Sequence, residues 1–280
     1  MRRRQVIHGT VAVAALGTAG FAWLERWAAP SSSLVDPHWQ VHEPDATRTV
    51  DHTAWAAWLR RYVAVDPNGP NRVRYAAVDP AARADLAGYL RGLQATTVTG
   101  LARPEQLAFW LNLYNARTVA VVLDHYPVAS IRDITFGRRA GAGPWREPLL
   151  TVEGRSLSLD DVEHGIVRPI FAEPRIHYAV NCAALGCPDL QPEPFLADRL
   201  EAQFDRAARS FVNDPRGVAV TAGGEVVASS IYNWFQADFG GSESAVLDHL
   251  RAHAAPSLRT ALDGASAIRR YDYDWSLNAA

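Results

Sequence analysis

The sequence predicts an α+β fold, a mostly helical single domain with a small, largely antiparallel sheet. Segments with apolar residues at helical spacing outnumber the short β-favouring segments, and the two kinds do not alternate regularly along the chain. Regular alternation would instead favour a parallel α/β sheet. The 280 residues are 48% hydrophobic and 21% charged, which is typical of a soluble globular protein.

The predicted helices combine apolar spacing with local start signals. Asp79 precedes Pro80, a cap followed by proline at the first helical position, and Ser158 precedes Asp161 at the spacing of a capping box. The predicted helices cover Asp51–Val65, Asp79–Leu93, Arg103–His125, a segment from Ser158, Pro194–Val212, Ser229–Gly240 and Ser242–His253.

Short β-favouring segments predict the strands. Two hairpins are expected where alternating residues flank the turns Glu153-Gly154 and Ala222-Gly223-Gly224. Arg72–Val78 is expected to be extended, and Ile268–Tyr273 is expected to be the last strand. Ile176–Val180 is apolar and β-favouring, so it predicts a buried strand that leads into a loop.

The first residues predict an export signal or an N-terminal anchor over 1–29. Three arginines, Arg2–Arg4, precede the apolar stretch Thr10–Leu24, and Arg3–Ile7 resembles a twin-arginine export signal. Ala28-Ala29-Pro30 is a poor cleavage site, so an uncleaved segment that anchors the protein to the membrane stays open. Either form places the protein outside the cytoplasm, in the periplasm or cell envelope, where disulfides are permitted.

Composition along the chain sets the domain boundaries. Residues 30–50 are rich in Pro, Ser, Asp and His and predict a linker, and the absence of a repeat or a second linker predicts a single domain over 51–280. The net charge of −2 excludes a global basic surface for nucleic acid.

The helix predicted over Arg103–His125 is apolar nearly all round, which indicates a buried central helix. Asn112 and Asn115 lie three residues apart and share one face of it. Buried amides need hydrogen-bond partners. The two asparagines are therefore expected either to hold a neighbouring loop or to belong to a site.

The stretch from Arg175 to Pro188 holds both cysteines of the chain, Cys182 and Cys187. Gly186 and Pro188 end the predicted strand, so the cysteines fall at its end and in the next loop. In an exported chain, a Cys182–Cys187 disulfide across this glycine turn is the first interpretation. It favours a non-catalytic binding module, with a disulfide-fixed loop, for a small-molecule or peptide ligand contacted by His177, Asn115 and Arg175.

The alternative interpretation is a thiol-dependent hydrolase or acyltransferase with Cys182 as nucleophile. A thiol needs a base or a cation nearby, and His164 is the candidate base because only residues 168–174 separate its helix from the predicted strand. Glu163 would orient the ring, and Asn112 would supply an amide to the imidazole or to an oxyanion. His177 is five residues from Cys182 and would face the opposite side of a strand.

Two buried, inert cysteines are a third interpretation. A labile redox pair is a weak variant of the disulfide, because the spacing is not Cys-x-x-Cys, and metal binding is also a weak alternative. His164, His177, Cys182 and Cys187 are the right residue types for zinc, but their spacing differs from that of zinc knuckles. The sequence therefore predicts neither a metal site nor a cofactor.

Several motifs resemble one family. The sequence resembles domain-of-unknown-function family 547, in its bacterial branch and as an exported member, over about residues 50–280. The matching motifs are Phe109–Ala116, Leu123–Pro127, Leu159–His164, Arg175–Cys182 with Gly186–Pro188, and Tyr273–Asn278. The resemblance implies a fold but no activity, so the interpretation is an uncharacterised cell-envelope protein.

Overall fold

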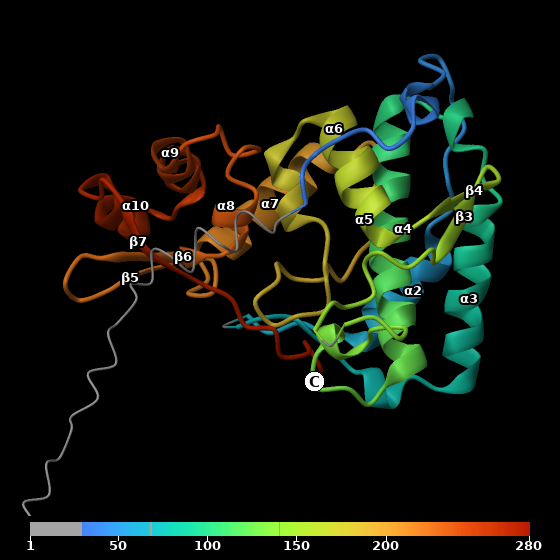
Figure 1. The fold of residues 1–280 in the computed structure, drawn as a ribbon, viewed down its shortest axis with the longest axis horizontal. Helices are drawn as coiled ribbons and strands as arrows, with labels where there is room; N and C mark the ends of the chain where they lie inside the picture. Colours follow the sequence, from blue (N-terminus) through green and yellow to red (C-terminus); the bar gives the residue numbers. More distant parts are fainter. Residues whose placement is uncertain (1–29, 68, 140) are drawn as a thin grey trace, which may run out of the picture.

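The computed structural model describes residues 30–67, 69–139 and 141–280, so the export signal or anchor predicted at 1–29 lies outside the described residues. The fold is mostly helical α+β, as the sequence predicts. Helices α2 (Thr53–Tyr62), α3 (Pro80–Gln94) and α4 (Arg103–His125) lie together at one end of the molecule (Figure 1). Asp79 caps α3 through the backbone N–H of Ala82, with Pro80 at the first helical position.

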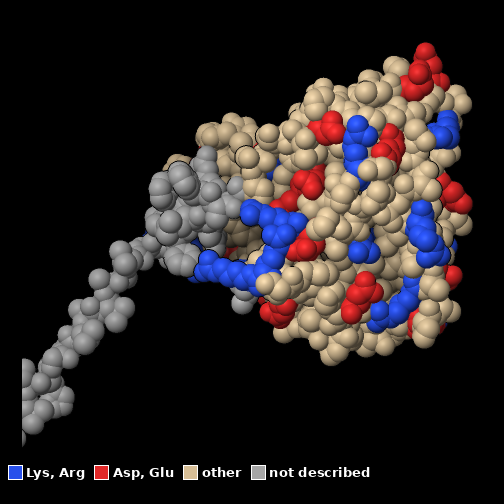
Figure 2. Space-filling view, turned by 45° about the vertical axis from the view of Figure 1, so that its right-hand side comes forward, with Lys and Arg blue, Asp and Glu red and all other residues tan. Residues whose placement is uncertain are grey.

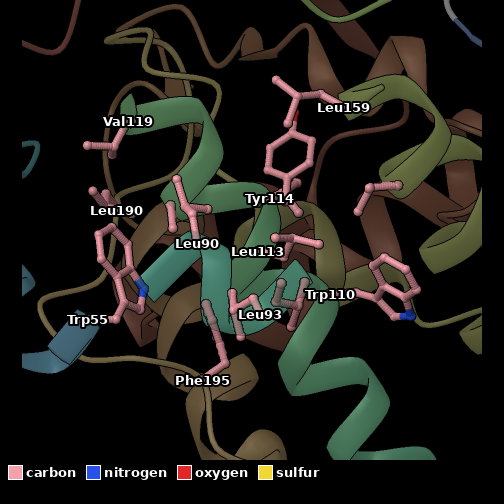
Figure 3. Close-up of a cluster of buried hydrophobic side chains, with 14 of the residues drawn as sticks. Trp55, Leu90, Leu93, Trp110, Leu113, Tyr114, Val119, Leu159, Leu190 and Phe195 are labelled. Atoms are coloured by element: carbon pink, nitrogen blue, oxygen red, sulfur yellow. The ribbon is translucent and has the colours of Figure 1, made fainter. Parts of the chain in front are cut away.

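The helix α4 is the centre of the larger hydrophobic core. It is buried on nearly all sides, as its unbroken apolar pattern predicts, and its side chains pack against α2, α3 and the loop at Phe195. Figure 3 shows Trp110, Leu113 and Tyr114 of α4 within this core. A rigid, buried helix of this kind positions any polar side chain that it carries.

Three short helical segments follow the hairpin at Glu153-Gly154. Ser158 and Asp161 form the capping box that starts α5 (Leu159–Val162), as the sequence predicts. The chain then forms the π-helix η5 (Glu163–Val167) and the short helix α6 (Arg168–Phe171). A π-helix is rare and often occurs at functional sites, because it displaces side chains from the α-helical register.

In the described residues, the strands form three small sheets and not one. Antiparallel pairs join β1 (Val63–Ala64) to β2 (Arg72–Val73), and β3 (Leu150–Val152) to β4 (Arg155–Leu157). In the third sheet β6 (Val226–Ser229) lies between β5 (Val218–Val220), which is antiparallel to it, and β7 (Ile268–Asp272), which is parallel. The parallel pair is possible because a long helical connection separates β6 from β7.

The third sheet packs in a second, smaller core. It includes residues of α7 (Leu200–Val212), α9 (Glu243–His253) and α10 (Pro256–Asp263) (Figure 1). The segment η6 (Pro174–Tyr178) lies at the junction, because Ile176 belongs to the first core and Tyr178 to the second. The cysteines follow directly after this segment, so the fold delivers them to the boundary between the cores.

The prediction of a buried strand at Ile176–Val180 is wrong. Pro174 fixes the backbone at the start of a 3-10 helix, and the Glu173 carboxylate accepts a hydrogen bond from the backbone N–H of Arg175. Burial explains the apolar composition of this segment, but none of the strands in the described residues pairs with it. The expectation that His177 and Cys182 face opposite sides of a strand therefore does not apply.

Other boundaries also differ from the prediction. Helix α7 starts at Leu200, because the Gln203 side chain binds the backbone of Pro194 and Leu196 and holds that stretch outside the helix. Only α8 (Ile231–Trp234) is α-helical in the predicted helix Ser229–Gly240. Helix α10 was not predicted.

The segment predicted as a linker, residues 30–50, lies against the body of the protein. The backbone N–H groups of Ser33 and Val35 donate to the carbonyls of His164 and Gly165 in the π-helix, and Trp39 is buried in the first core. None of the described helices has the length and apolar composition of a transmembrane span. Acidic and basic side chains are interspersed over the visible face in Figure 2, in agreement with a net charge near zero.

Candidate functional site

We define the cysteine loop as residues 181–188. Cys182 near its start and Cys187 near its end lie in contact. Cys182 is partly exposed and Cys187 is buried, and both are free thiols in the structure. The backbone N–H of Cys182 donates to the Cys187 sulfur at 3.1 Å, and the two side chains are hydrogen-bonded. The Cys182–Cys187 disulfide stays a prediction that such a short separation permits.

The C-terminal segment fixes one side of the cysteine loop. The backbone N–H of Leu185 donates to Ser276, and that of Gly186 donates to Asp274. A Cβ atom at Gly186 would lie 2.6 Å from the Asp274 nitrogen, so this close approach requires glycine. The Arg216 guanidinium donates to the carbonyls of Leu185 and Cys187 on the other side.

Asn115 and Asn181 hold the loop from the core side. The Asn115 side chain donates to the Ala179 carbonyl and accepts from the backbone N–H of Asn181, both at 2.8 Å. The Asn181 side chain in turn accepts from Ala183 N–H and donates to the Pro188 carbonyl. Asn115 is therefore a strut from the central helix to the loop, one of the two roles that its sequence position allows.

The environment of Cys182 favours its thiolate. A hydrogen bond from Cys187 lowers the pKa of Cys182 most, burial opposes it, and the Tyr273 hydroxyl at 3.1 Å and the backbone N–H of Ala184 lower it further. Burial raises the pKa of Tyr273 well above its usual value, so the phenol keeps its proton at neutral pH and is able to donate a hydrogen bond to a Cys182 thiolate. Burial likewise raises the pKa of Cys187. The two thiols are thus unequal.

Half-exposed aromatic rings lie next to Tyr273. Its ring centroid is 4.6 Å from that of Trp275 and 4.8 Å from that of Trp234. Trp145 contacts Trp275 edge-on, and the Arg132 guanidinium lies over the same ring. The side of Cys182 that carries the phenol is therefore continuous with an aromatic surface.

His164 does not contact the thiol. Its Nδ1 accepts from Arg168 at 3.0 Å and lies 3.8 Å from Glu163, and burial lowers the pKa of the ring to about 4. The hydrogen bonds of Cys182 within the described residues involve Cys187, Tyr273 and backbone groups, and no imidazole. Glu163 acts on the thiol only through its charge, which raises the pKa of Cys182.

His177 belongs to a buried charged cluster with Arg168 and Asp238. The Asp238 carboxylate accepts from His177 Nε2 at 2.7 Å and from Arg168 Nε at 2.6 Å. The His177 ring stacks on Phe235 at 4.3 Å. This cluster ties η6 and α6 to the segment after α8, and none of its three residues is hydrogen-bonded to the sulfur of Cys182 or Cys187.

The two remaining candidates lie elsewhere. The Asn112 side chain accepts from the backbone N–H of Phe195 and donates to the Phe195 carbonyl, so its amide holds that loop. Arg175 forms an ion-pair cluster with Glu173, Glu201 and Asp205 at the surface. Neither residue meets the cysteine loop, and their predicted catalytic and binding roles stay predictions.

Sequence analysis missed Tyr273 and Asn181 as site residues. Both fall within motifs that carried the family resemblance, which was the available signal. The contact of Tyr273 with Cys182 spans 91 residues, so no local pattern predicts it.

We expect Asn115→Leu to destabilise the protein by about 2–4 kcal/mol, because two buried backbone groups lose their partners. It should also slow alkylation of Cys182, because the loop loses its strut. Asn112→Leu is the matched control: it leaves Phe195 equally unpaired, so it should cost similar stability but leave the alkylation rate unchanged. Urea unfolding and iodoacetamide kinetics measure the two effects. Equal alkylation rates in both variants would contradict the assigned strut.

The described residues contain no group of three or more His, Cys, Asp or Glu side chains arranged to hold a metal ion. Comparison with protein families finds one match: residues 98–212 match the model of the family described as "Protein of unknown function, DUF547". The match confirms the family resemblance, whereas the bacterial branch and export stay predictions. No curated protein and no solved structure matches the chain.

Proposed function

Because residues 98–212 match the model of the family DUF547, whose description assigns no activity, we propose the function of the protein from the cysteine loop itself. We propose that the protein is a thiol–disulfide exchange protein. Cys182 is the attacking thiol and Cys187 is the resolving thiol. The observation that carries the proposal is the contact between the thiol of Cys182, a partly exposed residue with a lowered pKa, and the thiol of Cys187, a buried residue with a raised pKa.

The reaction balances in two steps. The Cys182 thiolate attacks a substrate disulfide, forms a mixed disulfide and releases one substrate thiolate. The Cys187 thiol then loses its proton, attacks the Cys182 sulfur and releases the second substrate thiolate, so the substrate gains the two electrons that the cysteine pair loses. Tyr273 and the backbone N–H of Ala184 stabilise the Cys182 sulfur whenever it carries negative charge.

The two functions suggested by the sequence use the same loop differently. A binding module would keep a permanent disulfide, whereas a hydrolase or acyltransferase would keep Cys182 reduced and use His164 as base. The contacts of His164 with Arg168 and Glu163 support the exchange chemistry over the hydrolase, since no imidazole is hydrogen-bonded to the sulfur. Export, which the sequence predicts, would supply an oxidising compartment.

The reduction potential of the cysteine pair tests the proposal. We expect a value between about −120 and −270 mV, the range of exchange proteins, measured by thiol counting in glutathione and dithiothreitol buffers. A value below about −300 mV would instead identify a structural disulfide and thus the binding module. Failure to form a bridge, with Cys182 still reactive, would leave the hydrolase. Either result overturns the exchange function.

Alkylation of the reduced protein tests the assigned thiols. Iodoacetamide should modify Cys182 at pH 7 faster than a model thiol and should spare Cys187. Tyr273→Phe should slow the modification about fivefold, since it removes one hydrogen bond to the thiolate. Tyr271→Phe, two residues earlier in β7, is the control and should leave the rate unchanged. Cys187→Ser should trap the mixed disulfide on Cys182.

A further inference from the structure

A cavity of about 220 Å³ lies between α3 and α4 and is not part of the cysteine site. It is lined by Arg83 and Arg91 from α3 and by Arg117 from α4. Arg117 is two residues after Asn115, so it points about 200° away around the helix. Asn115 faces the cysteine loop, and the cavity therefore lies on the opposite side of α4.

The cavity has an excess of positive charge. Three guanidinium groups line it, and Asp124 is the one carboxylate among its lining residues. Arg83 already donates to the Leu123 carbonyl at 2.7 Å. The guanidinium groups of Arg91 and Arg117 form no hydrogen bond or ion pair with the other described residues, so their donors are available to a ligand.

Arg117 gives a second, independent indication. Its Nε is a buried atom without a hydrogen-bond partner among the described residues. Burial lowers the pKa of this guanidinium, and the charge of Asp124 offsets only part of that effect. The Nε–H group has lost its hydration without gaining an acceptor, which is costly although the side chain as a whole is only half-buried. An acceptor that enters the cavity would remove that cost.

The rest of the lining is apolar. Leu86, Leu90 and Leu123 are buried side chains that border the cavity beside the arginines. A site with convergent cationic groups and an apolar wall suits a ligand that has one charged and one hydrophobic part. Guanidinium groups bind carboxylates and phosphates with paired hydrogen bonds.

We propose that this cavity binds a small organic anion, with its phosphate or carboxylate group on Arg91 and Arg117 and its apolar part on the three leucines. The inference is independent of the proposed exchange chemistry, because it rests on different residues on the other side of α4. Reduction of the cysteines should therefore not change the affinity.

Calorimetric titration of the full chain tests the proposal with three probes. Phenyl phosphate and phenylacetate carry the two head groups on the same apolar ring, and benzyl alcohol carries the ring alone. We expect saturable binding of at least one anion and none of the alcohol. The stronger of the two anions identifies the head group. Absence of saturation by both anions up to about 5 mM would overturn the proposal.

Arginine variants locate the site. Arg117→Met and Arg91→Met should each weaken binding about tenfold, since each removes charge-assisted hydrogen bonds but keeps an unbranched apolar stem. Arg60→Met is the matched control, because Arg60 is an exposed helical arginine outside the cavity. An equal loss in the control, or no loss in the cavity variants, would refute the assigned site.

A spectroscopic measurement does not depend on the folding of any variant. The Nε–H signal of Arg117 should shift on titration with the anion that binds, because that N–H gains an acceptor. The Nε–H signal of Arg60 should not move. A titration that saturates while the Arg117 signal stays fixed would overturn the proposal.

Discussion

Asp238→Ala is expected to destabilise the protein by about 3–5 kcal/mol, because it leaves the buried Arg168 guanidinium without its carboxylate. The Arg168 side chain is 3% exposed and donates to Asp238 at 2.6 Å, and His177 donates to the same oxygen at 2.7 Å. The other acceptors of the Arg168 guanidinium, the Pro30 carbonyl and His164, are neutral groups and do not balance the charge of Arg168. Urea unfolding at pH 7 measures the loss.

The matched control is Asp248→Ala, which removes an exposed ion pair with Arg251. It should change the unfolding free energy by less than about 1 kcal/mol. Replacing both Arg168 by Met and Asp238 by Ala should recover part of the loss, because no buried charge then lacks a partner. A loss below 1 kcal/mol for Asp238→Ala would show that the cluster does not stabilise the junction between the cores.

The same carboxylate has a pH signature. Burial raises the pKa of Asp238, but hydrogen bonds from His177 and Arg168 lower it by more, to well below its usual value. A carboxyl with a lowered folded-state pKa stabilises the fold above its unfolded pKa of about 3.9 and loses that contribution as the pH falls further. The cost of Asp238→Ala should therefore stay constant down to about pH 4 and shrink below it.

We expect the second large effect on acidification between pH 6.5 and pH 4. Burial lowers the pKa of His52 and of His164 to about 4, so both rings are neutral in the folded protein at pH 6, whereas the unfolded chain binds protons below about 6.5. Between these pH values the unfolded state binds more protons than the folded state, so the free energy of unfolding decreases as the pH is lowered. The loss is on the order of 2–3 kcal/mol for each histidine.

The contacts of His52 give the physical reason. Its Nε2 lies 3.3 Å from the Asn112 side-chain nitrogen, which is a donor, so a proton on Nε2 would oppose another N–H. Both residues are buried, so water cannot solvate the added charge. His52→Gln and His164→Gln should each flatten the fall in unfolding free energy between pH 6.5 and pH 4.

His125→Gln is the control for this prediction, because His125 is exposed at the end of α4. It should leave the pH dependence unchanged. Unfolding free energies that are constant from pH 7 to pH 4.5 in the unmodified protein would contradict the prediction, as would equal slopes in the protein and in both buried-histidine variants.

The elements that were predicted well depend on local sequence. Helix α4 follows from a 23-residue segment with apolar side chains on nearly all sides, and α3 and α5 follow from the capping signals at Asp79 and Ser158. The hairpin β3–β4 follows from its glycine turn. Each of these signals acts within a few residues, so no knowledge of the rest of the chain is needed.

The elements that were predicted poorly depend on distant partners. The apolar run Ile176–Val180 has strand composition, but no strand pairs with it among the described residues. Its first three residues belong to a 3-10 helix instead, and Asn115 binds the carbonyl of Ala179 and the backbone N–H of Asn181. Helix α7 begins late because Gln203 holds the preceding backbone. Propensity is a weak signal wherever tertiary hydrogen bonds compete with it.

By itself the sequence determined the helical class of this protein, its central buried helix and the segment that carries its thiols, because these follow from hydrophobic spacing and residue type. Tertiary structure alone decided what each polar group contacts. Cys182 meets Tyr273 and not His164, and His177 meets Asp238, across separations of 91 and 61 residues. Such contacts depend on the packing of two cores around one loop, and no local pattern encodes that packing.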